Sequence, residues 1–77
     1  MTSILDSEPS IETQLALLQQ EVNMAVNTRW QLNMRYRVNK RIGNESSLKQ
    51  LETELESIEK YLSALEAEVK QLAGKGN

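Results

Sequence analysis

The sequence predicts an all-α protein, an antiparallel two-helix hairpin that resembles a short coiled coil. Apolar residues repeat in alternating steps of three and four from residue 48 to residue 72, a period that no strand produces. A second stretch with this period precedes it, and a short connection near residues 43–46 makes the two helices antiparallel neighbours. We therefore expect one unit over 1–77, with helices at about 8–42 and 47–73, a leader over 1–7 and a flexible tail over 74–77.

Composition suggests how so small a protein is stabilised. A chain of 77 residues buries little core and usually needs disulfides, a metal or oligomerisation. The sequence has no Cys and no His, which excludes disulfides and removes the thiolate and imidazole ligands of zinc. We therefore expect the additional stability to come from self-association or from a larger protein assembly.

The first helix should begin at the segment 7–10, Ser-Glu-Pro-Ser, which combines a capping hydroxyl, an acid and a first-turn proline. Its heptad row is interrupted by Arg29 and Asn39. Lys40 and Arg41 followed by Gly43 form a helix stop.

The second helix should begin at Ser47, which has capping-box spacing to Gln50, and end at Gly74. Its apolar row is bordered by glutamates on both sides, so a copy of the same helix would be repelled and a basic partner is required. We predict an intra-hairpin seam of Leu15, Leu18, Val22, Leu32, Tyr36, Leu48, Leu51, Leu55, Ile58, Leu62, Leu65, Val69 and Leu72.

Charges should align across this seam. Folding the chain about residues 44–45 places Glu52 near Arg37 and Glu54 near Arg35, with Glu59 near Arg29 or Trp30. Such exposed pairs contribute only about 0.2–1 kcal/mol each, so they select the partner helix more than they stabilise it.

The segment 34–43 also permits a different fold. Apolar and polar residues alternate from Met34 to Asn39, the period of a strand, and a turn near Asn39-Lys40 would give a small β-hairpin between two helices. This helix–β-hairpin–helix arrangement, with strands within 34–43, is the alternative fold class.

Residues 36–60 carry a family resemblance. Tyr36-Arg37-Val38-Asn39-Lys40-Arg41, followed by the capped helix Ser47-Leu48-Lys49-Gln50-Leu51-Glu52, resembles the small head–tail joining proteins of tailed phages, the lambda W-type. The resemblance implies a helix–β-hairpin–helix fold and a non-enzymatic subunit of the virion, repeated around a ring and ordered by its neighbours.

Enzyme chemistry finds no support in these residues. No glycine loop could cradle a phosphate, and no His could activate the Ser and Thr hydroxyls. The acidic group Glu52, Glu56 and Glu59 is typical of a solvated helix flank. We expect no enzyme, no catalytic residue, no metal, no cofactor and no small-molecule substrate.

Instead, the first helix is apolar on two sides, and one partner seldom covers both. We predict a non-enzymatic structural subunit that assembles through helical packing into a homo-oligomer or larger protein complex, such as a phage virion. Its expected partner interface consists of Leu17, Met24, Trp30, Met34, Val38 and Ile42.

The alternative function is nucleic-acid binding by the basic segment 29–41, which combines cations with aromatic rings. Against it stand the net charge of −2 and the glutamates available for pairing. Its possible contacts are Arg29, Arg35, Arg37, Lys40 and Arg41. No signal peptide and no apolar run of about 20 residues is present, so we expect no membrane partner and a soluble cytoplasmic location, or a virion location if the chain is phage-encoded.

Overall fold

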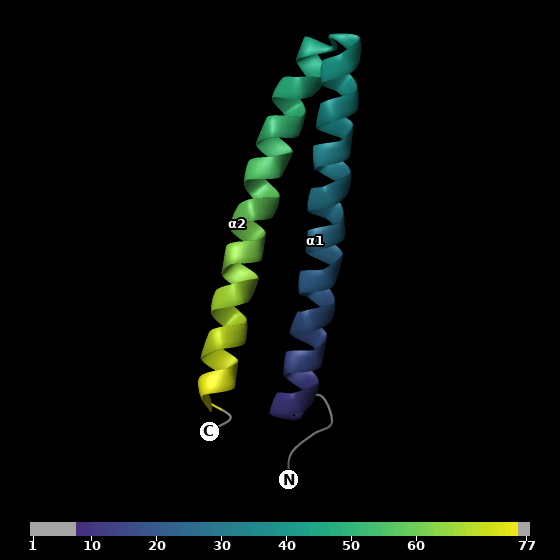
Figure 1. Cartoon of the computed structure of the whole chain (residues 1–77). Coiled ribbons are helices and arrows are strands. Elements are labelled where there is room, and N and C mark those ends of the chain that lie inside the picture. Colours follow the sequence, from purple (N-terminus) through teal and green to yellow (C-terminus); the bar gives the residue numbers. More distant parts are fainter. Residues whose placement is uncertain (1–7, 76–77) are drawn as a thin grey trace.

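The computed structural model describes residues 8–75, which form two long helices lying side by side in opposite directions (Figure 1). Helix α1 spans Ile11–Ile42 and helix α2 spans Glu45–Lys75. The molecule measures 61 × 26 × 15 Å, and the start of α1 and the end of α2 lie at the same end of the hairpin. The predicted all-α helical hairpin is confirmed.

Helix α1 begins later than predicted. Ser10 is the N-cap, with extended backbone angles, and its Oγ accepts a hydrogen bond from the backbone N–H of Thr13 at 3.2 Å. Gln14 Nε2 donates to the carbonyl oxygen of Pro9 at 2.7 Å. Because the second serine of the segment 7–10 is the cap, Pro9 precedes the helix instead of occupying its first turn. Ser7 and the rest of the predicted leader lie outside the described residues.

The connection consists of Gly43 and Asn44. Gly43 has a φ of 73°. Its N–H donates a hydrogen bond to the carbonyl oxygen of Lys40 at 3.3 Å, and the N–H of Asn44 donates to the carbonyl oxygen of Asn39 at 3.0 Å. These two bonds form a Schellman cap, in which glycine adopts the left-handed conformation without strain. The predicted stop at Gly43 is thus correct.

Helix α2 begins and ends outside its predicted limits. The Oδ1 of Asn44 accepts from the backbone N–H of Ser47 at 3.4 Å and from the Oγ of Ser46 at 3.2 Å, so Asn44 is the cap. The predicted capping box at Ser47 is therefore wrong, because an earlier side chain already fills that role. Gly74 was also wrong as the stop, since the helix continues through it to Lys75, and 76–77 lie outside the described residues.

The β-hairpin alternative is wrong. Residues 34–42 belong to α1, and no strand occurs within residues 8–75. The amide of Asn39, where the turn was expected, donates to the carbonyl of Arg35 one helical turn earlier at 2.8 Å. Tyr36 and Asn39 are both half-buried, so the seam period runs through the segment and outweighs its local alternation.

All the predicted seam residues are buried or half-buried. The most buried are Ala25 and Leu32 on α1 and Leu51 and Leu65 on α2, which expose between 4% and 8% of their surface. Among the described residues no side chain is completely enclosed. The core is therefore a single thin layer between two helices.

Candidate interaction surface

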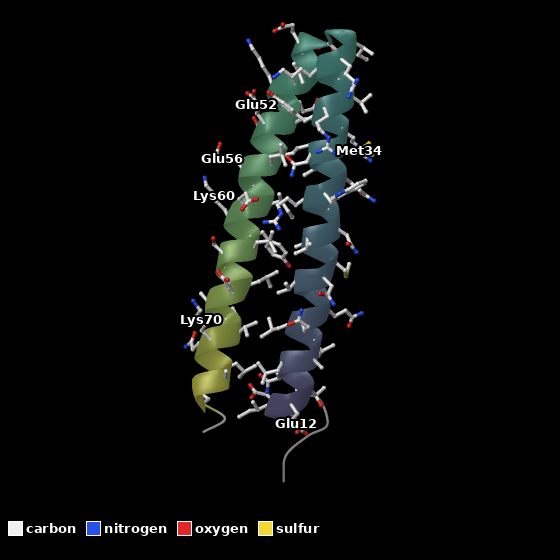
Figure 2. The ribbon with its side chains drawn as sticks, viewed as in Figure 1. Glu12, Met34, Glu52, Glu56, Lys60 and Lys70 are labelled. Carbon is white, nitrogen blue, oxygen red and sulfur yellow. The ribbon has the colours of Figure 1, made fainter. Side chains whose placement is uncertain are left out.

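An exposed apolar face runs along α1 on the side turned away from α2. We call it the outer face, and it consists of Leu17, Met24, Trp30, Met34, Val38 and Ile42, the predicted partner interface. Ile42 exposes 70% of its surface, Trp30 62% and Met24 56%. Figure 2 shows Met34 projecting from α1 away from α2.

Helical spacing explains why these side chains form one surface. Trp30, Met34, Val38 and Ile42 follow each other in steps of four, so each lies beside the next along the helix. Leu17 and Met24 are one heptad apart and extend the surface toward the N-terminus. Met34 is half-buried although it lies on the side of α1 turned away from α2.

Arginines border the outer face. Arg37 lies one turn from both Met34 and Arg41 on one side, while Arg35 lies one turn from Val38 on the other. All three arginines are exposed. The N-terminal part of α1, in contrast, has acids and no base: Glu12 and Glu21 are its charged residues. The C-terminal part of the outer face is thus bordered by arginines, whereas the N-terminal part has no basic residue beside it.

One flank of the hairpin is held by contacts that repeat every seven residues. The Nη1 of Arg29 donates to Glu59 Oε1 at 3.3 Å, as predicted. One heptad closer to the connection, the Oη of Tyr36 donates to Glu52 Oε1 at 3.3 Å. Arg29 is half-buried in the seam, so it does not interrupt the seam but closes its edge with a charge pair.

Two other predicted ion pairs are wrong. Within residues 8–75, Glu52 makes no ion pair with Arg37, and Glu54 makes none with Arg35. Glu54 shares a surface hollow with Thr28, two turns along α1 from Arg35. The residues of α1 and α2 that face each other are therefore offset differently on the two flanks of the hairpin. A single fold-back point could not predict the facing residues on both flanks.

The second flank carries a contact that sequence reasoning missed. The Oη of Tyr61 donates to Glu21 Oε2 at 3.1 Å, although Tyr61 had been treated only as a neutral residue beside the seam. One heptad closer to the connection this flank brings Glu54 opposite Thr28. Glu54 is seven residues before Tyr61, and Thr28 is seven residues after Glu21. The heptad repeat could therefore have indicated that both pairs face each other on this flank.

These hydrogen bonds perturb the two tyrosines. The hydrogen bond to Glu52 and the charge of that carboxylate raise the pKa of Tyr36, with a smaller contribution from burial. The carboxylate of Glu21 raises the pKa of Tyr61 in the same way. In each case ionising the phenol would remove the donor and place two negative charges side by side.

The five predicted nucleic-acid contacts do not converge on one surface. Arg29 is engaged with Glu59, and Arg35 lies on the opposite flank in a hollow with Ser47 and Gln50. Arg37 and Arg41 border the outer face. Nor do the acids of α2 converge, since Glu56 pairs with Lys60 at 3.4 Å. Within residues 8–75 no group of three acidic side chains is arranged to hold a metal ion.

Comparison of the chain with protein-family models, with curated proteins and with solved structures found no significant match. Within the described residues, neither helix combines the length and the apolar character needed to cross a bilayer.

Proposed function

We propose that this chain is a non-enzymatic interaction subunit that assembles, through the outer face of α1, into a homo-oligomer or a larger protein complex. The observation that carries the proposal is the outer face itself. Four of its six side chains, those of Leu17, Met24, Trp30 and Ile42, are more than half exposed although α2 already covers the other side of the helix. Exposed apolar surface of this extent marks interaction sites, and Trp and Met are typical anchors.

The surface area of the chain supports this. The chain exposes 6283 Å², whereas a compact monomer of its mass exposes about 4,800 Å². The difference is larger than the roughly 800 Å² per partner that a standard interface buries. An assembly would therefore give this chain the burial that its own two helices do not supply.

A phage virion is one setting for such a subunit, suggested by the resemblance of residues 36–60. Within that segment, residues 36–42 are the helical end of α1, where the resemblance implies a β-hairpin. The proposal therefore depends on the outer face, and the virion setting is secondary.

The test is the variant Met34→Asp/Val38→Asp. Charges at the centre of the interface should leave the helical circular dichroism largely intact and reduce the mass measured by light scattering to that of one chain. A matched control places the same charges on the exposed side of α2, as Ala64→Asp/Ala67→Asp, and should keep the wild-type mass. A monomeric wild type, or a double variant that assembles normally, would contradict the proposal.

A second candidate, binding of nucleic acid, is favoured by one observation. Arg35, Arg37, Lys40 and Arg41 are exposed and make no ion pair within the part of the chain that the structure describes. Particle mass that falls on nuclease treatment would support this role. Binding to any polyanion, and only at low salt, would contradict it, because that behaviour reports nonspecific charge attraction.

A further inference from the structure

We propose that the C-terminal part of the outer face binds an α-helix of another protein, one that has a single apolar row with acidic residues on both sides of it. This inference rests on the proposed function and adds the chemistry of the partner. Four apolar side chains of α1 make the contact, and we call them the outer ridge: Trp30, Met34, Val38 and Ile42.

The outer ridge has a shape that another helix fits. Its members follow each other in steps of four, the spacing of the ridges that enter the groove of a facing helix. From Trp30 to Ile42 the ridge is about 18 Å long, at roughly 1.5 Å per residue. A partner helix of about 12 residues therefore spans it, in the manner of an amphipathic helix bound through one apolar face.

Charges on both sides of the ridge define the flanks of this partner. The two rows of α1 that adjoin the ridge are exposed and polar, and they consist of Asn33, Arg37 and Arg41 on one side and Asn27, Gln31 and Arg35 on the other. The three arginines make no ion pair within residues 8–75. A helix that packs on the ridge meets a guanidinium on each flank, so acids on both sides of its apolar row complement the surface.

The hairpin already contains a contact of this kind. Helix α2 has one apolar row bordered by glutamates, and it packs on the inner side of α1. There the Nη1 of Arg29 donates to Glu59 Oε1 at 3.3 Å. An acidic helix on the outer ridge repeats the same combination, an apolar row with arginine–carboxylate contacts at its edge, on the opposite side of α1.

The outer face of a second copy offers the arginines little to pair with. Glu21 accepts a hydrogen bond from Tyr61 on the α2 side, at 3.1 Å. Glu12, the other acid in that half of α1, lies in the first turn. Purified chains that bury the ridge against one another therefore leave the arginines without carboxylates, and a helix with acidic flanks should displace them.

A membrane surface or a nucleic acid complements the ridge less well. A helix that lies in a bilayer surface buries a broad apolar face, whereas exposed Asn27 and Gln31 adjoin the ridge and would enter the lipid with it. Nucleic acid would engage the arginines through its phosphates. It would leave Val38 and Ile42 without an apolar cover.

Two synthetic helical peptides test the chemistry of the partner. Each is about three heptads long with leucine at positions a and d, and positions e and g are glutamate in one and lysine in the other, so neither pairs with itself. The wild-type chain should bind the glutamate peptide with a Kd roughly ten-fold below that for the lysine peptide. Trp30 is the only tryptophan of the chain, so a shift of its emission to shorter wavelength reports that the ridge is covered. With the glutamate peptide in excess, the mass measured by light scattering should fall to that of one chain and one peptide.

A charge reversal provides the second test. Arg37→Glu/Arg41→Glu should weaken binding of the glutamate peptide roughly ten-fold and tighten binding of the lysine peptide. Structural damage alone would weaken both, so the reversed preference identifies the charge contact. Lys60→Glu/Lys70→Glu is the matched control, because it makes the same change in net charge on the side of α2 turned away from α1, where Figure 2 shows both lysines. It should keep the wild-type preference.

The outcomes separate the two proposals. If Met34→Asp/Val38→Asp assembles and binds the glutamate peptide as the wild type does, the proposed function fails, and this inference with it. If the wild type assembles through the outer face but binds the two peptides equally, or binds neither, the acidic partner alone is overturned. Trp30 emission that shifts with phosphatidylserine vesicles or duplex DNA, and with neither peptide, would assign the ridge to a membrane surface or to nucleic acid and also overturn the inference.

Discussion

The register of the second flank predicts that Thr28→Arg stabilises the hairpin. Thr28 is exposed and lines the same hollow as Glu54, one heptad from the observed contact between Glu21 and Tyr61. An arginine there gains a carboxylate partner across the helices. Because both groups are solvent-exposed, the expected gain is about 0.5 kcal/mol, the middle of the range for surface pairs. In a domain of this size it raises the Tm by about 2–4 °C.

Comparison among substitutions at this one site isolates the charge. Thr28→Gln has nearly the helix propensity of Thr28→Arg but no charge, and Thr28→Glu reverses the charge. Thermal unfolding followed by circular dichroism, at one protein concentration, should order the Tm values Arg above Gln above Glu. The difference should shrink in 1 M salt, where the screening length is about 3 Å. The same series at Ala64, on the exposed side of α2, should show no such order. Equal Tm values for Thr28→Arg and Thr28→Glu would refute the register.

Two further predictions concern the connection and the tyrosines. Gly43→Ala should lower the free energy of unfolding by about 1 kcal/mol, because Gly43 has a φ of 73°. Gly74→Ala, within regular helix, should raise it by about 0.5 kcal/mol. Denaturant unfolding measures both changes, and a loss of stability in Gly74→Ala would contradict the helical extension to Lys75. In a Tyr61→Phe background, Tyr36 should titrate above its ordinary pKa of about 10, and Glu52→Gln should lower that pKa, as read from tyrosinate absorbance. Since the folded-state pKa is the raised one, this contact stabilises the fold below about pH 10 and the stabilisation is lost as the pH rises through the folded pKa. A pKa of Tyr36 that Glu52→Gln leaves unchanged would contradict the contact.

The seam could be predicted from sequence because burial on a helix repeats with a fixed period. The row from Leu48 to Leu72 meets α1 as expected, and all its members are at least half-buried. The helix ends were harder to predict. Each start offers more than one capping side chain within four residues, Ser7 or Ser10 for α1 and Asn44, Ser46 or Ser47 for α2, and periodicity does not distinguish them.

Cross-helix pairs were predicted on one flank and missed on the other. The pair between Arg29 and Glu59 lies on the flank whose register matches a turn at residues 44–45. On the opposite flank each side chain of α2 lies beside a residue of α1 that is nearer the N-terminus than the fold-back point predicts. Glu54 therefore lies opposite Thr28, and Ser47 lies beside Arg35. Such an offset arises from how the two helices pack, which no single position in the sequence encodes.

The two helices differ in the number of apolar faces that must be buried, and this difference connects folding to assembly. Helix α2 has one apolar face, bordered by acids, and its packing on α1 leaves every member of that face buried or half-buried. Helix α1 has two apolar faces, and α2 covers only the one that contains Ala25 and Leu32. A hairpin with so thin a core gains stability whenever the second face is buried, because association favours the folded state.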